Sequence, residues 1–306
     1  MSAREFISNV TVILAVMALA SALETAVPMR VERSGTQGRR TANLALTCVV
    51  FLLNWLLTSA AAIAAMAWSA RQTGPIAAPA DFAEVAAGVV FVDFCTSCLA
   101  HPIMSFPVFV QVALGVVLID FCTSYLAHRA MHVSPVLWRF HRVHHSDEFV
   151  DATTTFRTHP VESLWRFLFV IVPVSVFGIP ATAVVIQRLL QATNGVLQHA
   201  NIRLWRPVDR VLSLVWVTPD AHKIHHSRAV AETNSNYGNV LSVYDHFLGT
   251  FTPTERALNV TYGLNDEPPG GGTFRSLLSS PFHRGKAVPA TRLSIGKPDR
   301  SPRPAA

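Results

Sequence analysis

The chain has 306 residues, of which 50% are hydrophobic and only 14% are charged. An average soluble domain has about a quarter of its residues charged, so this composition excludes an ordinary soluble protein and predicts a membrane protein. The net charge of +6 does not indicate nucleic-acid binding, because the basic residues lie in loops and tails rather than on one face with interleaved aromatic side chains. The four cysteines lie in apolar stretches and indicate no disulfide framework.

The first two predicted elements are membrane-spanning helices. Residues 6–23 contain no charged side chain, which is near the lower limit for a span, and a cleavable signal peptide is the rival interpretation. Four arginines between positions 30 and 40 argue against export of the next loop, because positive loops stay on the inner side. The uncharged stretch 41–70 is long enough for a second span. We therefore predict an N-terminal transmembrane unit over residues 1–82.

An internal repeat of 27 residues follows. Residues 88–101 and 115–128 are identical at eleven of fourteen positions. The second copy is followed by His132, four residues after its last histidine, whereas the first copy has Ser105 at the equivalent place. We therefore interpret His101, the last residue of the first copy, as a histidine that does not bind a metal.

The repeat bears on the topology. If both copies crossed the bilayer, the histidine-rich segment after them and its arginines would lie outside, against the charge rule. We expect residues 85–127 to make one net crossing, with a break or a re-entrant bend marked by Pro102 and Pro107.

Three histidine groups dominate the second half of the chain. Their members are His128 and His132, then His141, His144 and His145, and finally His222, His225 and His226. Each group contains histidines three and four residues after its first member or four residues after it, so on a helix each group lines one face. A single histidine is usually a solvated or hydrogen-bonded side chain, but three such groups indicate metal ligands. Asp120 and Asp245 are candidates to accept a hydrogen bond from the other nitrogen of these rings.

The segments between the groups are also interpretable. Thirty-nine residues separate His159 from His199, with a Gly-Ile-Pro breaker at 178–180, so a helical hairpin returns the chain to the same side. Residues 211–217 are short and apolar and predict an interfacial or packed segment. Asp220 is a candidate cap for the helix of the third group.

The remaining residues predict small elements and a tail. Residues 236–238 are typical of a turn, and residues 241–250 of a short amphipathic helix that ends at its glycine. Residues 266–306 are rich in Pro, Gly, Ser and basic residues, which predicts a disordered basic tail. We place a catalytic domain between these limits, over residues 83–265.

Eight histidines exceed the four ligands of one zinc ion and suit two metal ions with nitrogen-rich coordination. We favour iron, because an iron pair can use O2 to attack an unactivated C–H bond and zinc cannot. A zinc-dependent membrane hydrolase stays open, although such boxes usually contain a carboxylate and none of these does. A metal-binding or transport protein also stays open, and it would need more intramembrane carboxylates than Glu24, Asp93 and Asp120.

The motifs follow one another as His-x3-His at 128–132, His-x2-His-His at 141–145, Phe-Arg-x-His-Pro at 156–160, Gln-His-x-Asn at 198–201, Thr-Pro-Asp-x-His-x2-His-His-Ser at 218–227, Asn-Tyr-Gly at 236–238 and Asp-x3-Gly-Thr at 245–250. In this order they resemble the fatty acid hydroxylase and sterol desaturase superfamily. The resemblance covers Asp120 to Thr250 and leaves out the N-terminal helices, the first repeat copy and the tail.

The resemblance implies an all-α, polytopic membrane protein with a cytoplasmic, helical, histidine-rich cap that holds two Fe ions; a purified or mis-metallated form could carry Zn. It also implies an enzyme that uses O2 and external electrons to hydroxylate or desaturate a lipid, whether a fatty acyl chain, a sterol or a related compound. No fused haem-binding His-Pro-Gly-Gly or rubredoxin-like module is visible in the sequence, so we expect a separate cytochrome b5-like or ferredoxin-like electron donor and no nucleic-acid partner.

The resemblance also assigns residues. Implied metal ligands are the eight grouped histidines and, as a ninth, His199. Implied outer-shell residues are Asp120, His159, Asn201, Asn236 and Asp245. Where relatives often have Asp followed by Arg, this chain has His246, which we expect to be an accessory residue rather than a ligand.

Overall fold

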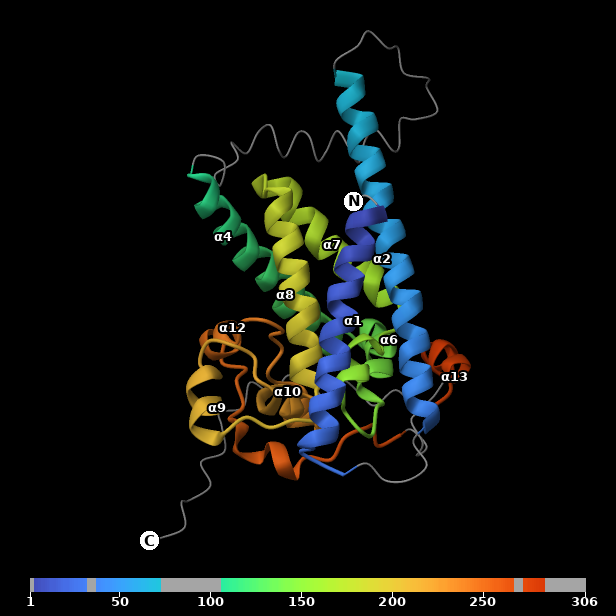
Figure 1. Ribbon diagram of the computed structural model, residues 1–306, viewed down its shortest axis with the longest axis vertical. Helices are drawn as coiled ribbons and strands as arrows, with labels where there is room; N and C mark the ends of the chain where they lie inside the picture. Colours follow the sequence, from blue (N-terminus) through green and yellow to red (C-terminus); the bar gives the residue numbers. More distant parts are fainter. Residues whose placement is uncertain (1–2, 32–36, 73–105, 267–271, 284–306) are drawn as a thin grey trace.

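Helices make up nearly all the regular structure of the protein, which we describe from a computed structural model (Figure 1). The structure describes residues 3–31, 37–72, 106–266 and 272–283. Within these ranges the only strand-like contact is one antiparallel bridge between Trp216 and Leu241. The predicted all-α fold class is confirmed.

Long helices form the upper part of the molecule in Figure 1. They are α1 (Ala3–Ala26), α2 (Gln37–Gln72), α4 (Val108–Asp120), α7 (Pro160–Phe177) and α8 (Ala181–His199). Helix α4 continues through a π-helical turn into α5 (Ala127–Val133). Four segments are long and apolar enough to cross a membrane, namely residues 6–26, 38–61, 108–133 and 160–177. These four candidate spans support the expectation of a polytopic membrane protein.

Helices α7 and α8 form the predicted hairpin. Pro160 occupies the first turn of α7, and Gly178 ends this helix with a positive φ of 64°, a left-handed conformation that glycine adopts without strain. Pro180 then precedes α8. The hairpin returns His199 to the end of the molecule at which α7 begins (Figure 1).

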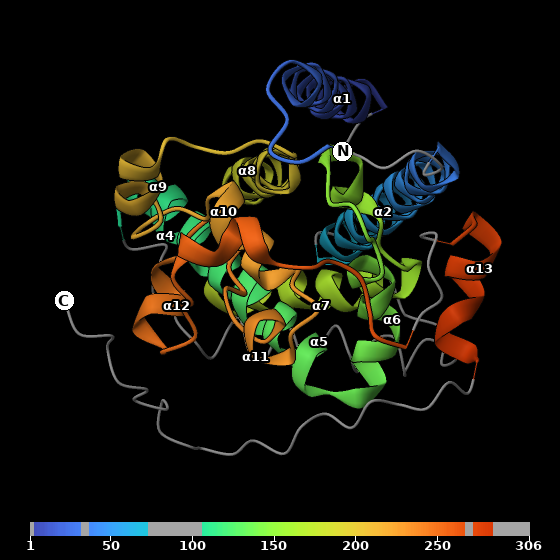
Figure 2. The ribbon, with the colours of Figure 1, turned by 90° about the horizontal axis from the view of Figure 1, so that it is seen from below.

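Short helices gather at the lower end of the long ones and form a cap (Figures 1 and 2). They are α5, α6 (Pro135–His145), α9 (Arg206–Leu212), α10 (Pro219–His225), α11 (Val230–Thr233) and α12 (Val243–Phe247), with 3-10 turns η3 (Ala152–Phe156) and η4 (Thr254–Asn259). Side-chain hydroxyls start two of them: Ser134 caps α6 and Thr218 caps α10. The expected cap Asp220 instead lies inside the first turn of α10, because Thr218 accepts the Ala221 N–H.

Buried polar contacts fasten the two N-terminal helices to the cap. The Arg39 guanidinium of α2 forms ion pairs with Asp147 and Asp151. Glu24 of α1 accepts the backbone N–H groups of Ala152 and Asn201. Each contact joins the N-terminal unit to residues more than a hundred positions away, so α1 and α2 help to position the loops that flank the histidines.

The expected tail contains folded structure. Residues 274–279 form α13, and residues 280–282 form the 3-10 turn η5. Leu277 is buried against Ala42 and Leu46 of α2. The prediction of disorder is therefore wrong for these residues, because a short apolar segment finds a hydrophobic surface on α2 that the local sequence does not reveal.

Several expectations concern residues outside the described ranges. They include the first repeat copy at 88–101 with Asp93 and His101, the bend at Pro102, and positions 284–306 of the tail. Of the predicted crossing over 85–127, the described part is helical from Val108 onward.

Candidate metal centre

Nine histidines from four helical elements meet in the cap. His128 and His132 lie on α5, and the second group lies on α6. His199 ends α8, and the third group lies on and directly after α10. All nine side chains are buried. The structure thus brings together every histidine that the sequence suggested as a metal ligand.

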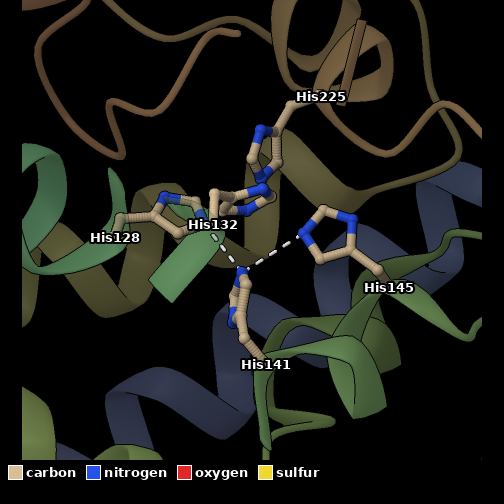
Figure 3. A group of neighbouring side chains, drawn as sticks. All are labelled: His128, His132, His141, His145 and His225. Atoms are coloured by element: carbon tan, nitrogen blue, oxygen red, sulfur yellow. Dashed lines mark hydrogen bonds between the residues drawn. The ribbon is translucent and has the colours of Figure 1, made fainter. Parts of the chain in front are cut away.

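The nine rings divide into two groups, and within each group one nitrogen atom from every ring lies within 4.8 Å of those from the others. We call them the five-histidine group, with His128, His132, His141, His145 and His225, and the four-histidine group, with His144, His199, His222 and His226. Figure 3 shows the first group, in which rings from three helices point inward. Each group draws on the second and third histidine boxes, so the division does not follow the order of the sequence.

Protein acceptors hold the outer nitrogen of every ring in the five-histidine group. The Nδ1 atoms of His128 and His225 contact the carbonyl oxygens of Tyr237 and Ser235, each at 2.7 Å. His141 Nδ1 lies 2.9 Å from the Glu162 carboxylate. The two other rings contact side chains: His132 contacts Asn234 at 3.2 Å and His145 contacts Thr233 at 3.4 Å. These contacts fix the tautomer that leaves Nε2 free to bind a metal.

The four-histidine group is built differently. His199 Nδ1 donates to the Gly195 carbonyl at 2.7 Å. The Nδ1 atoms of His144, His222 and His226 are buried and have no hydrogen-bond partner among the described protein groups. The Nε2 atoms of these three rings lie 3.0–3.1 Å from His199 Nε2.

The nitrogen contacts fit metal ions better than hydrogen bonds. His128 and His141 each use Nδ1 toward an oxygen acceptor, and their Nε2 atoms face each other at 3.0 Å. With Nδ1 as the donor, each Nε2 of a neutral ring carries a lone pair, so the contact is repulsive without a cation between them. Nitrogens that share one ion through bonds of about 2.0–2.1 Å lie roughly 3 Å apart. The residues present therefore fit a pair of bound metal ions.

Burial keeps the rings neutral. It lowers the pKa of His141, His144 and His145 well below the usual value, and the neighbouring imidazoles lower it further. Burial also lowers the pKa of His199 to about 3 and that of His225 to about 4. Because metal binding requires an unprotonated nitrogen, these rings are ready to act as ligands at neutral pH.

Two expected outer-shell residues act on other parts of the site. Asp120 accepts hydrogen bonds from Ser124, Gln187 and the Leu241 N–H rather than from a histidine. Asp245 accepts the N–H groups of Tyr237 and Gly238. Asp245 thus supports His128 at one remove, because it fixes the turn whose Tyr237 carbonyl contacts that ring.

The other three expected outer-shell residues contact backbone groups of neighbouring segments. Asn236 has a φ of 52° and bonds the backbone of Ala221 and Thr252. Asn201 joins the backbone of Arg30 after α1. His159 accepts the Val161 N–H at the start of α7 and contacts the Leu278 carbonyl. Within the described part of the chain, their hydrogen bonds go to backbone groups and not to a ring of the two groups.

The sequence reasoning missed the acceptors that do contact the rings. Glu162, Asn234 and Thr233 provide side-chain oxygens. A signal existed for Glu162, because it is the single acidic residue of the apolar helix α7. His246 behaves as expected for an accessory residue: it stacks on Phe251 and contacts the Ser213 carbonyl, outside both groups.

Fold and site together define a helical membrane protein with a buried histidine centre that could hold metal ions. Residues 112–250 match the fatty acid hydroxylase family. Over 157 residues the chain is 34% identical to ornithine lipid hydroxylase OlsE from Rhizobium tropici. The aligned region covers 51% of this chain and 46% of that protein.

Two animal enzymes are also similar. Alkylglycerol monooxygenase from Danio rerio is 30% identical over 141 residues, or 44% of this chain and 29% of that protein. The Caenorhabditis elegans alkylglycerol monooxygenase is 29% identical over 138 residues, or 44% of this chain and 26% of that protein. No solved structure matches. The chain spans less than half of each of these relatives. The resemblance to the fatty acid hydroxylase family is confirmed over residues 112–250, the part of the chain that matches this family.

Proposed function

We propose that this protein is a membrane-bound di-iron oxidoreductase that uses O2 and external electrons to hydroxylate a lipid C–H bond. The observation that carries the proposal is the convergence of nine buried, neutral imidazoles in two groups. The family match and the names of the relatives, a lipid hydroxylase and monooxygenases, support the same chemistry. A bound iron pair would supply the activation of O2 that the side chains themselves cannot perform.

The protein's own residues would hold and shield this chemistry. Five imidazoles would bind one ion and four the other, each through the nitrogen that faces the centre of its group. Glu162 and the carbonyls of Tyr237, Ser235 and Gly195 keep four of the rings in the required tautomer. The buried setting excludes bulk water, which limits side reactions.

We assign the metal centre to the cytoplasmic side. Helix α1 ends and α2 begins at the cap end of the molecule, and Arg30, Arg39 and Arg40 lie at this connection (Figure 1). Loops rich in Arg stay on the inner side of the membrane. An acidic, cytochrome b5-like or ferredoxin-like protein would deliver the electrons there.

The substrate class is a membrane lipid that enters sideways from the bilayer. His128 and His132 lie on α5, which continues α4, and His199 ends α8. An acyl or alkyl chain that follows these helices from the bilayer would approach the histidine groups without passing through water. The relatives act on an ornithine lipid and on alkylglycerols by name. A lipid with a polar headgroup and a long chain is the class that we propose.

A zinc hydrolase fits the geometry less well. It would need a free carboxylate base on the side of the rings that faces the metal. Glu162, the carboxylate in contact with a ring of the two groups, lies on the Nδ1 side of His141, behind the ring. This placement suits a group that orients a ligand rather than one that activates water.

Lipid mass spectrometry under 18O2 tests the proposal. Cells that express the protein should gain a lipid carrying one additional oxygen derived from labelled O2. His144→Ala, which removes a member of the four-histidine group, should abolish this product, while His246→Ala should retain it because His246 lies outside both groups. A loss of two hydrogens would indicate desaturation instead. Hydrolysed lipids with oxygen from water would contradict the proposal.

A further inference from the structure

Large apolar side chains are exposed on one side of the cap. They belong to α9, to the segment that follows it and to the end of α12, and we call them the α9–α12 face: Trp205, Val208, Val211, Leu212, Leu214, Val215, Phe247 and Leu248. Exposure reaches 74% at Trp205, 69% at Val211 and 91% at Phe247. Single exposed apolar residues are ordinary, but a contiguous set marks an interaction surface.

The orientation of α9 is fixed by contacts on its opposite side. Asp209 is buried and accepts the hydroxyl groups of Thr218 and Thr254. Val208, Val211 and Leu212 are nevertheless exposed, and with Pro207 they line a shallow groove of about 380 Å³. The apolar surface is thus built into the fold rather than left by a loose segment.

The face is tied to a candidate membrane span. The Ser242 hydroxyl donates to the Ser213 carbonyl, which joins α12 to the end of α9. The Tyr244 hydroxyl of α12 donates to the Val117 carbonyl of α4 at 2.9 Å. Val117 belongs to the span 108–133, and its own side chain is exposed. The apolar surface of the span therefore continues into the α9–α12 face, as the position of α12 beside the lower part of α4 in Figures 1 and 2 indicates.

Positive charge borders the apolar residues. Arg206 and Arg210 of α9 both lie near one carboxylate, that of Glu255, at 3.5 and 3.9 Å. Two cations against one anion leave a positive edge. Basic side chains beside exposed Trp, Phe, Leu and Val are typical of segments that lie in the boundary between lipid headgroups and acyl chains, where anionic headgroups attract them.

We propose that the α9–α12 face is immersed in the headgroup–acyl boundary of the same bilayer that α4 crosses. The cap would then be partly embedded rather than standing free in water. The segment that follows α9 leads directly into α10 through Val217 and Thr218. The third histidine group, which α10 carries, would therefore be held at a fixed depth close to the lipid. The proposal concerns the resting protein and is independent of the reaction that it catalyses.

Spin labelling in lipid nanodiscs tests this placement. Val211→Cys, Leu214→Cys and Phe247→Cys each accept a nitroxide at an exposed site, with Glu255→Cys as the exposed polar control. The background protein would have its native cysteines replaced by alanine, at Cys48, Cys95, Cys98 and Cys122.

The readout is the accessibility of each nitroxide to O2, which concentrates in lipid, and to a water-soluble nickel chelate. Labels at the three face positions should relax faster with O2 than with the chelate, and the label at position 255 should show the reverse order. Faster relaxation with the chelate at all three face positions would overturn the proposal. Shielding from both reagents would also overturn it, since a second copy or another protein would then cover the face.

Discussion

Glu162 and His141 show how a single buried carboxylate can set the properties of a histidine. The carboxylate lies 2.9 Å from His141 Nδ1, and both side chains are buried. Its negative charge makes the ring a stronger donor toward a metal on the opposite nitrogen. Loss of such a partner typically lowers metal affinity about 10–100-fold.

We therefore expect Glu162→Gln to keep the fold but to bind metal more weakly by that factor. Competition with a calibrated chelator measures the affinity directly, without reference to turnover. Glu255→Gln is the matched control, because Glu255 is half exposed and pairs with Arg206 and Arg210 rather than with a ring. Equal affinities in the two variants would show that Glu162 does not support the metal site.

At this scale the histidines that converge were predictable, and most of the groups that accept hydrogen bonds from their rings were not. Histidines three and four residues apart carry a spacing that any helix converts into one face. Their partners include the carbonyl oxygens of Tyr237, Ser235 and Gly195. Every residue has a carbonyl group, so no side-chain pattern can reveal which one will face a ring. The division of the nine histidines into groups of five and four also depends on how α6 and α10 are placed relative to each other. The spacing of residues along the sequence does not encode that placement.

At the scale of elements, α2 is attached to the cap through a buried charge. Arg39 pairs with Asp147 and Asp151, and all three side chains are at most 1% exposed. Removal of one partner from a buried ion pair leaves an uncompensated charge and costs about 3–5 kcal/mol. Arg39→Gln should therefore lower the unfolding temperature clearly in detergent. Arg40→Gln should cost about 0–1 kcal/mol, because the Arg40 side chain is 51% exposed. Equal unfolding temperatures for the two variants would refute this attachment.

Close helix packing depends on Gly115 of α4. A Cβ atom there would lie 2.6 Å from Ile179 Cγ2 and 2.9 Å from Ala183 Cβ. Gly115→Val should therefore destabilise the protein by about 1–3 kcal/mol through overpacking. Ala113→Val introduces the same side chain on the exposed side of α4 and should be nearly neutral. Thermal unfolding of both variants measures the difference, and a Gly115→Val protein as stable as the control would contradict the packing.

Elements with strong local signals were predictable from the sequence. The α7–α8 hairpin follows from two apolar segments around a Gly-Ile-Pro breaker. Helix α13 was not predictable, because its stability comes from burial of Leu277 against α2 more than two hundred residues earlier. A local reading of Pro, Gly and Ser in the tail cannot include that contact.

At the scale of the whole molecule, hydrophobic helices and a buried centre of histidines that could hold metal ions are combined in one fold. The candidate span at 108–133 runs into the cap through α5, and residues from both halves of the match at 112–250 meet in the two histidine groups. The sequence predicted the membrane class from composition and the centre from spacing. For residues 211–217 it left an interfacial and a packed segment open, and it could not choose between them, because exposed and buried apolar residues look alike until the fold orients them.

The most direct test of the account is Mössbauer spectroscopy of the purified protein loaded with 57Fe in nanodiscs. We expect two iron ions per chain, both in nitrogen-rich, high-spin ferrous sites when reduced, and both oxidised when O2 is admitted. Retention of at most one iron per chain, or two irons whose spectra do not respond to O2, would contradict a paired-iron centre built from these nine histidines.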